Sequence, residues 1–314
     1  MKHLKAYALP LAAAGLTACG GDAVQERPNI IFIMTDDHTT QAMSCSGGPL
    51  LETPNMDRIA SEGIRFDNCY ATNALSGPSR ACILTGKFGH MNGFTDNASR
   101  FDGSQQTFPK LLQKAGYKTG VIGKWHLISE PEGFDHWSII TGQEEQGDYY
   151  RPDFRENGVD VQEEGYVTDV ITDKALKFID TYADDGPFML MLHQKAPHRN
   201  WMPAPRHLGM FNDVTFPEPA NLFDDYEGRG EAARSQDMSI ANTLQDDWDF
   251  KLLTREEILA GNNRLYDVYT RMPEEVQHKW VVNYISFVKP LIVHFPSRKL
   301  FTWGSRKYFT WVSQ

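Results

Sequence analysis

Three short apolar runs in this sequence each end in charged or histidine side chains. Residues 30–34 lead to Asp36 and Asp37, the strand pattern that closes at Gly123 leads to "K-W-H", and "F-M-L-M-L-H" leads to "K-A-P-H". Runs this short, partly β-branched, predict buried and parallel strands rather than helices. Open α/β sheets place their ligands beyond the carboxyl ends of strands. The repeated pattern therefore predicts a doubly wound α/β sheet with its chemistry gathered at one edge.

Helix signals lie between these strands. In "T-P-N-M-D-R-I-A-S-E-G", Thr53 is the expected N-cap, Pro54 the first helical residue and Gly63 the end. A second short helix ends at Gly116. Residues 167–182 carry apolar side chains at the spacing of an amphipathic helix.

Two further segments carry weaker signals. "I-R-F-D-N-C-Y-A", residues 64–71, alternates like a strand. Residues 202–275 lose strand character, and we expect loops and polar surface helices there.

The length and net charge of the chain limit the number of domains and the kind of partner that we expect. With 314 residues, 41% of them hydrophobic, the chain can form one large domain or two smaller ones. A net charge of -10 argues against nucleic acid as a partner, because the phosphate backbone favours the opposite sign. A local cationic pocket for a small anionic substrate remains compatible with this charge.

The first residues are typical of an export signal. Lys2 and Lys5 precede an apolar run too short to span a bilayer. The ending "L-T-A-C" resembles the cleavage box of bacterial lipoproteins, which implies an acylated Cys19 and a membrane-anchored protein facing the periplasm or the cell surface. The alternative is an ordinary cleaved signal with a chance cysteine. We expect a signal peptide at residues 1–18 and a linker at residues 19–27.

The other cysteines are Cys45, Cys69 and Cys82. One disulfide among them and buried free thiols are both open alternatives, and none has the spacing of a metal ligand.

Residues 276–314 differ in composition from the rest of the chain. They contain no Asp or Glu, although the chain has 41 acidic residues before them. One interpretation is a basic, aromatic tail that packs or lies on a membrane surface. The other is a reading-frame shift near Trp280.

The strand-end residues form a chemically coherent set. Adjacent carboxylates at Asp36 and Asp37 suit a hard cation such as Ca²⁺, although a solvated turn is the alternative for a lone pair. Arg80 and Lys124 offer positive charge to an oxyanion.

Three residues of the set have roles that involve protons or the start of a helix. His126 and His198 can exchange a proton with a leaving oxygen, although a single histidine is more often structural. Ser76 opens the run "S-G-P-S-R", and it is either a helix N-cap or a reactive group.

The run "S-G-P-S-R-A-C-I-L-T-G" resembles the signature of the type I sulfatases, in which Cys or Ser is followed by x-Pro-x-Arg and x-x-Leu-x-Thr-Gly. "P-N-I-I-F-I-M-T-D-D", "T-P-N-M-D-R-I-A-S-E-G", "G-K-W-H" and "K-A-P-H" resemble the same family in the same order. The chain is most similar to bacterial carbohydrate sulfatases that act on 6-O-sulfated N-acetylglucosamine of glycosaminoglycans. The resemblance implies an alkaline phosphatase-like α/β fold, with a mostly parallel sheet sandwiched by helices, and hydrolysis of sulfate esters on sulfated glycans.

The resemblance also implies a modified nucleophile. In that family a maturase oxidises the first signature residue to formylglycine, so Ser76 would be its precursor. The hydrated aldehyde attacks the ester sulfur through one hydroxyl and releases sulfate through the other. Asp36, Asp37 and the modified Ser76 would bind Ca²⁺, and Arg80 would hold the hydrate in its ionised form.

The remaining roles concern the sulfate group. Lys124 and His198 would contact it and stabilise or protonate the leaving oxygen. His126 would steady the hydrate and assist its collapse. These cationic groups would be fixed around the sulfate oxygens, where charge shifts during the reaction.

One part of the family pattern is missing. After His198 there is no Asp followed by Asn, Gln or His and then Gly, the run that completes the calcium shell in the family. We therefore expect residues 28–275 to be a partial sulfatase catalytic domain with the C-terminal part of the fold missing. Such a chain would bind Ca²⁺ weakly, turn over poorly and aggregate through an exposed sheet edge and an apolar face.

Two other functions compete with this one. A metal-dependent phosphatase or phosphodiesterase of the same superfamily would use Ser76 unmodified as its nucleophile. A non-catalytic lipoprotein fragment would bind glycans through aromatic residues such as Tyr149, Tyr150 and Trp201.

Overall fold

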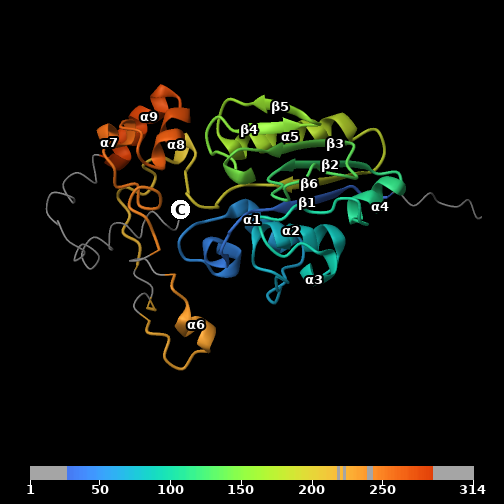
Figure 1. Cartoon of the computed structure of the whole chain (residues 1–314), viewed down its shortest axis with the longest axis horizontal. Coiled ribbons are helices and arrows are strands. Elements are labelled where there is room, and N and C mark those ends of the chain that lie inside the picture. Colours follow the sequence, from blue (N-terminus) through green and yellow to red (C-terminus); the bar gives the residue numbers. More distant parts are fainter. Residues whose placement is uncertain (1–26, 218–219, 222–223, 239–242, 286–314) are drawn as a thin grey trace, which may run out of the picture.

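The computed structural model describes residues 27–217, 220–221, 224–238 and 243–285 (Figure 1). Within them, strands form one sheet in the order β1-β6-β2-β3-β4-β5. Strands β1, β6, β2 and β3 run parallel to one another, whereas β4 pairs antiparallel with both β3 and β5. The strand bounds are β1 (Ile30–Met34), β2 (Lys118–Gly123), β3 (His136–Ile140), β4 (Asp153–Glu156), β5 (Val159–Gln162) and β6 (Phe188–His193).

Helices lie on both sides of this sheet (Figure 1). Helix α5 (Val167–Tyr182) covers one face, and α2 (Ser76–Thr85) lies on the other. The remaining helices are α1 (Pro54–Glu62), α3 (Gly89–Asn92), α4 (Phe108–Lys114), α6 (Glu231–Ser235), α7 (Arg255–Leu259), α8 (Leu265–Arg271) and α9 (Glu274–Trp280). The expected α/β class, with a mostly parallel sheet between helices, is confirmed.

The alternation of side chains along the central strands builds two hydrophobic cores. On β2, Ile122 packs in the cluster that contains α5, and its neighbour Val121 packs in the cluster that contains α2. On β6, Leu190 packs in the cluster with α5 and Met191 packs in the cluster with α2. Successive side chains of a strand point to opposite faces, so a strand covered on both faces is apolar throughout.

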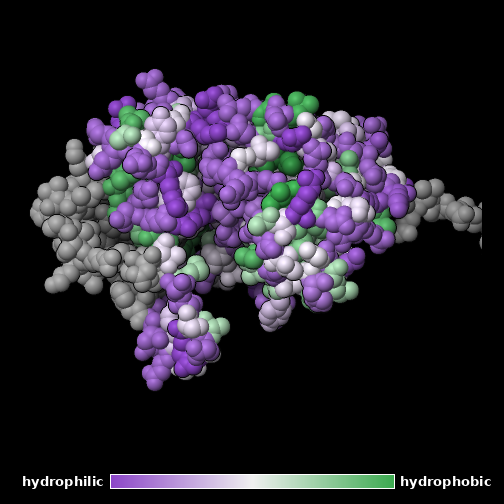
Figure 2. Space-filling view, viewed as in Figure 1, coloured by the Kyte–Doolittle hydropathy of each residue, from purple (hydrophilic) through white to green (hydrophobic). Residues whose placement is uncertain are grey.

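Strand β1 is less buried than its apolar sequence predicts. It is the edge strand, with only β6 beside it. Ile31 is 47% exposed and Ile33 is 56% exposed, on the face that they share with Leu190 and Leu192 of β6. The expectation of a buried strand is therefore wrong on this face, because α5 packs over β2 and β6 and leaves β1 uncovered. In Figure 2, hydrophobic atoms interrupt the mostly hydrophilic surface over the middle of the molecule.

The strand expected at residues 64–71 is absent from the structure. Ile64, Phe66 and Tyr70 are all more than three-quarters exposed. Alternation alone does not make a strand, because each strand needs a neighbour that completes its hydrogen bonds. No described strand lies beside this segment.

Two helices match the sequence closely. Helix α5 spans the expected residues 167–182, and α1 begins at Pro54 and ends before Gly63. Thr53 is the N-cap of α1, but its hydroxyl does not cap the helix. It donates instead to Asp57 at 3.2 Å and accepts the main-chain N–H of Ser44 at 3.0 Å.

The segment after residue 202 packs more than its sequence suggested. Helices α7, α8 and α9 lie together beside the sheet (Figure 1). They contribute apolar side chains, including Ile258, Leu265, Val276 and Trp280, to the same core as α5. Helix α9 thus crosses the expected domain boundary at residues 275–276.

Several expectations fall on residues outside the described part of the chain. These are the signal peptide, the lipid anchor at Cys19 and the part of the tail from residue 286 onward. Cys45, Cys69 and Cys82 are free thiols in the structure, but Cys69 is exposed and the other two are half-buried, so the expectation of buried thiols is wrong. No helix in the described ranges is long and apolar enough to cross a bilayer.

Candidate active site

Ser76 and Asp36 meet where β1 ends and α2 begins. Leu75 is the N-cap of α2 and Ser76 is its first helical residue. The Ser76 hydroxyl donates a hydrogen bond to Oδ1 of Asp36 at 3.3 Å, and Asp36 is 5% exposed. The N-cap alternative for Ser76 is therefore wrong, because its hydroxyl points to the strand end and not to the helix amides.

Two buried cations surround the same carboxylate. Lys124 Nζ contacts Oδ2 of Asp36, and Arg80 Nη2 lies 3.6 Å from the same atom. Both cationic side chains are at most 4% exposed. Arg80 stands one helical turn after Ser76, so the x-Pro-x-Arg spacing brings its guanidinium to the site from the same helix.

Burial and charge act against each other in this group. Burial alone would raise the pKa of Asp36, but the charges of Lys124 and Arg80 outweigh it and the pKa is lowered. Burial lowers the pKa of Arg80 to about 10 and also lowers the pKa of Lys124, and in each case Asp36 offsets part of the effect. At neutral pH the site therefore holds one carboxylate between two cations.

Gly123 allows strand β2 to deliver Lys124 to this position. Its φ is +108°, and a Cβ at this residue would lie 1.8 Å from the carbonyl oxygen of His193. The next residue, Lys124, donates its main-chain N–H to that same carbonyl at 2.9 Å. Only glycine fits between β2 and β6 here.

The histidines of the site are held in their neutral form. Burial and the charges of Lys124 and Arg80 lower the pKa of His126 to about 4. Burial, Lys124 and Lys195 lower the pKa of His198. His198 Nδ1 donates to the carbonyl of Arg199 at 2.6 Å, and its Nε2 lies 3.6 Å from Oδ2 of Asp37.

Asp37 adds an exposed carboxylate to the oxygen donors at this strand end. Its side chain is 61% exposed, and it follows the buried Asp36, whose carboxylate accepts a hydrogen bond from the hydroxyl of Ser76. Carboxylate and hydroxyl oxygens are the donors that Ca²⁺ takes, so these three residues fit the expected metal. The set is partial, because the described residues contain no group of three or more His, Cys, Asp or Glu side chains able to hold a metal ion.

The structure thus brings all seven predicted residues to one edge of the sheet. Their contacts run from Asp36 to Ser76, Arg80 and Lys124, and from Asp37 to His198. His126 joins through Gln146, whose amide contacts both Lys124 and His126.

Two neighbours of this edge were not predicted as site residues. Gln146 lies in "G-Q-E-E-Q-G-D", a polar run with no motif that would single it out. Lys195 is 2% exposed, and its ammonium lies 4.9 Å from the centre of the Tyr149 ring. Lys195 could have been predicted as a site residue, because it begins the "K-A-P-H" run at the end of a strand.

The structure does not support glycan binding through Tyr149 and Tyr150. Tyr149 is 2% exposed and donates its hydroxyl hydrogen to the carbonyl of His198 at 2.5 Å. Tyr150 is 1% exposed and donates to the carbonyl of Pro203 at 2.5 Å. Both tyrosines are buried and donate to main-chain carbonyls of the segment after β6, so their prediction as glycan-binding residues is wrong. Trp201 is half-buried, with the Lys251 ammonium 5.9 Å from the centre of its ring.

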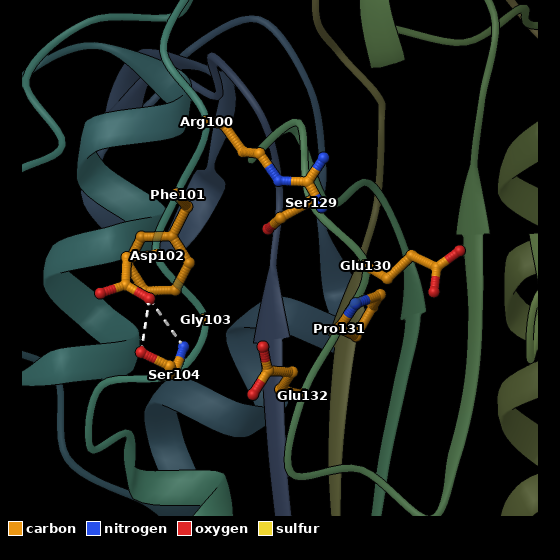
Figure 3. A pocket seen from close by; sticks show the side chains of 9 residues that line it. All are labelled: Arg100, Phe101, Asp102, Gly103, Ser104, Ser129, Glu130, Pro131 and Glu132. Atoms are coloured by element: carbon orange, nitrogen blue, oxygen red, sulfur yellow. Dashed lines mark hydrogen bonds between the residues drawn. The ribbon is translucent and has the colours of Figure 1, made fainter.

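A pocket of about 540 Å³ lies elsewhere, between residues 100–104 and residues 129–132 (Figure 3). Its walls are polar, and Ser104 closes a turn by donating to Asp102. Glu130 points away from the other lining residues and pairs with Arg155 at 3.0 Å. None of the predicted site residues lines this pocket.

The chain is similar to known proteins of one family. Residues 28–247 match the family model for Sulfatase. The chain is 73% identical over 275 residues to an N-acetylglucosamine-6-O-sulfatase of Bacteroides thetaiotaomicron, covering 87% of this chain and 49% of that protein. It is 32% identical over 250 residues to the N-acetylgalactosamine-6-sulfatase of Homo sapiens, covering 67% of this chain and 47% of that protein. The chain therefore spans about half the length of these relatives.

A solved structure shares the fold. It is BT4656 in complex with its substrate, D-glucosamine-2-N,6-O-disulfate, and it superposes with a TM-score of 0.87 at 67% identity. The match covers 92% of this chain and 59% of that one. With the signature serine at a helix start beside two strand-end aspartates, and with a family match across most of the described residues, this chain belongs to the sulfatase family.

Proposed function

We propose that this edge of the sheet is the active site for hydrolysis of sulfate esters on amino sugars. The substrate class is a 6-O-sulfated glucosamine unit of a glycosaminoglycan. The observation that carries the proposal is the Ser76 hydroxyl, 3.3 Å from Asp36 and beside the buried cations of Arg80 and Lys124. The named activity of the 73% identical relative and the disulfated glucosamine in the 67% identical structure support the substrate class.

The two cations bind and orient the sulfate. A sulfate monoester carries one negative charge spread over its oxygens, and more charge develops on the bridging oxygen as the ester breaks. Arg80 and Lys124 act in a water-poor setting, where charges interact more strongly than in bulk water. Their positions are fixed before the substrate arrives, so little reorganisation is needed during the reaction.

Lys124 is the group best suited to protonate the leaving oxygen. Burial lowers the pKa of Lys124, so its ammonium gives up a proton more readily than an exposed lysine. His198 acts differently. Its Nδ1–H is held by the carbonyl of Arg199, so Nε2 is the atom that accepts or carries a proton beside Asp37.

Two groups that the family implies fit this site. A formylglycine hydrate at position 76 would supply an oxygen nucleophile and a second hydroxyl for the release of sulfate. Asp36, Asp37 and residue 76 would hold a Ca²⁺ ion, which would supply positive charge to the site. A maturase that converts Ser76 is thus a required partner under this proposal.

The proposal includes a location. An exported lipoprotein anchored through Cys19, in the periplasm or at the cell surface, would meet glycans outside the cytoplasm. Release of the chain from membranes by Cys19→Ala, followed by fractionation, tests this placement.

The decisive experiment for the function combines two measurements on the full chain expressed with a serine-type maturase. Mass spectrometry of the peptide that contains residue 76 is expected to show the loss of two hydrogen atoms. Ion chromatography is expected to show sulfate release from N-acetylglucosamine-6-sulfate, and Ser76→Ala is expected to abolish both signals. The matched control is Ser79→Ala, three residues along the same helix, which is expected to keep both.

Three outcomes would count against the proposal. Unmodified Ser76 with phosphate release from N-acetylglucosamine-6-phosphate would favour the phosphatase alternative. Binding of sulfated glycan without sulfate release by the converted chain would favour a binding function. Sulfate release that persists in Ser76→Ala would place the chemistry elsewhere.

A further inference from the structure

A strained turn lies directly beside the proposed active site. Gln143, Glu144 and Glu145 form the 3₁₀ turn η3 (Gln143–Glu145), and their φ angles are +42°, +57° and +63°. Gly142 and Gly147 flank them, also with positive φ. Non-glycine residues rarely adopt this left-handed conformation and persist in it only where the surrounding structure holds them. Three in succession indicate that the turn is maintained for what it positions.

The turn is hydrogen-bonded to the loop that follows β2. Oε2 of Glu145 accepts the main-chain N–H of Leu127 at 3.0 Å and that of Ile128 at 3.1 Å. This loop carries two left-handed residues of its own, His126 and Ile128. The carboxylate of Glu145 therefore fixes the main chain on which His126 stands.

The next residue, Gln146, reaches the side chains of the site. Its Oε1 accepts a hydrogen bond from Nζ of Lys124 at 2.5 Å, and its Nε2 lies 3.1 Å from Nε2 of His126. An ammonium group only donates, so the carbonyl end of the amide must face Lys124. The NH₂ end then faces His126 and donates to it.

This orientation determines which ring nitrogen of His126 carries the proton. An Nε2 atom that accepts from Gln146 holds no hydrogen, so neutral His126 is protonated on Nδ1. Burial and nearby cations lower the pKa of His126 to about 4, which keeps the ring neutral at pH 7. Nδ1 is buried, and no partner for it exists among the described residues. The Nδ1–H is thus a preorganised donor without an acceptor in the described part of the chain.

We propose that Gln146 is a positioning residue of the sulfate-ester site: its amide holds the Lys124 ammonium with one end and selects the Nδ1–H tautomer of His126 with the other. The inference rests on the proposed function for its chemical meaning. With this tautomer, His126 donates a hydrogen bond from Nδ1 to the oxygen at position 76 or to the ester. The hydrogen bond to Gln146 also restrains the ammonium of Lys124.

A substitution of Gln146 by a side chain of nearly the same shape tests whether its hydrogen bonds, and not only its packing, determine the tautomer of His126. Gln146→Glu replaces the NH₂ donor by a second acceptor, so His126 must place a proton on Nε2 to keep the contact. Gln146→Met keeps the length of the side chain but removes both hydrogen bonds. Gln106→Glu introduces the same new charge at an exposed position and is the matched control.

The test is nitrogen NMR of the full chain labelled with ¹⁵N-histidine at pH 7, with the His126 signals assigned by their loss in His126→Asn. In the wild type and in Gln106→Glu, Nε2 is expected at the unprotonated position and Nδ1 at the protonated one. In Gln146→Glu, Nε2 is expected to move to the protonated position. In Gln146→Met, His126 is expected to shift toward a mixture of tautomers.

The wild-type spectrum is informative by itself, so the inference stays testable if a variant fails to fold. An Nε2–H tautomer in the wild type would overturn it. A wild-type tautomer that persists in both folded Gln146 variants would overturn it as well. None of these readouts needs sulfate release, so failure of the inference and failure of the proposed function are distinguishable.

Discussion

Arg80 donates a hydrogen bond from Nη1 to the main-chain carbonyl of Lys124 at 2.6 Å, which ties helix α2 to the end of strand β2. The same nitrogen lies 3.1 Å from Nδ1 of His193 on β6. One guanidinium therefore joins three elements of the sheet edge and also faces Asp36. Its role in the fold and its role in binding an anion depend on the same contacts.

Arg80→Gln is expected to destabilise the chain strongly. It removes the shorter of two contacts to the carbonyl of Lys124, which also lies 3.0 Å from Nδ1 of His193, and it removes one of the two cations that face the buried Asp36. Breaking a buried ion pair by removing one partner costs about 3–5 kcal/mol. Urea unfolding followed by circular dichroism measures the free energy of unfolding. Arg234→Gln, which breaks the exposed pair with Glu231, is the control, and an equal loss in both variants would contradict this account.

Gly123→Ala tests the close approach of β2 and β6. A Cβ there would lie 1.8 Å from the carbonyl oxygen of His193, so the two strands would have to separate. Gly186 also has a positive φ, +98°, but nothing lies within 4 Å of a Cβ at that position. Gly186→Ala therefore reports backbone strain alone, and Gly123→Ala reports strain plus the clash.

The two glycine variants have different expected outcomes in thermal unfolding. Gly186→Ala is expected to cost on the order of 1 kcal/mol, and Gly123→Ala several times more, on the order of 3 kcal/mol or above. Similar melting temperatures for the two variants would show that the strand spacing at Lys124 is not tightly fixed.

The sequence identifies the site better than it identifies the packing around it. Strand ends are recognisable because a short apolar run must stop where polar side chains begin, and parallel strands bring those ends to one edge. Asp36, Lys124 and His198 could be found in this way. Helix α5 could also be found, because sixteen residues of amphipathic spacing leave few alternatives.

Other features depend on contacts that a local pattern does not encode. The exposure of Ile31 follows from the place of β1 at the sheet edge, which its apolar sequence does not reveal. The hairpin of β4 and β5 could have been predicted, because Asn157-Gly158 is a typical hairpin dipeptide. In the structure both residues have positive φ angles. Gln146 left none, because its importance comes from the two side chains that its amide meets in space.

The stability of the chain is expected to fall as the pH drops below about 6.5. Complete burial and the charge of Arg80 lower the pKa of His193 to about 3, so this ring stays neutral in the folded chain and takes up a proton on unfolding. The unfolded state binds more protons between these two pKa values, so stability is full above the unfolded value and is lost as the pH falls toward the folded one. From pH 7 to pH 5 this histidine alone accounts for a loss of about 2 kcal/mol.

His193→Gln is the variant that isolates this effect. It keeps a neutral polar side chain at the buried position and removes the titrating group, so the loss of stability from pH 7 to pH 5 should shrink by about 2 kcal/mol. Urea unfolding at the two pH values measures the difference, and His90→Gln, at an exposed histidine, controls for the substitution. An unchanged difference in His193→Gln would mean that other groups carry the pH dependence.

Calcium is expected to stabilise the folded chain through Asp37. Asp36 is already paired with Lys124 and Arg80, whereas the exposed carboxylate of Asp37 lies 3.6 Å from Nε2 of His198. A ligand at ten times its Kd stabilises the folded state by about 1.4 kcal/mol. Ca²⁺ should therefore raise the Tm of the wild type, and a chelator should reverse the rise. Asp37→Asn should remove most of it, because Ca²⁺ affinity follows the charge of the ligands.

Two comparisons make the calcium experiment specific. Asp102→Asn removes a carboxylate far along the chain from the site and should leave the Ca²⁺-dependent rise in Tm intact. Mg²⁺ at the same concentration should stabilise the chain less, because it requires near-ideal octahedral geometry and gives up its water reluctantly. A rise in Tm that is equal for both ions, or that survives in Asp37→Asn, would place the cation away from Asp36 and Asp37. A rise confined to Ca²⁺ and lost with Asp37 would assign the metal to the strand end where Ser76 and Asp36 already meet.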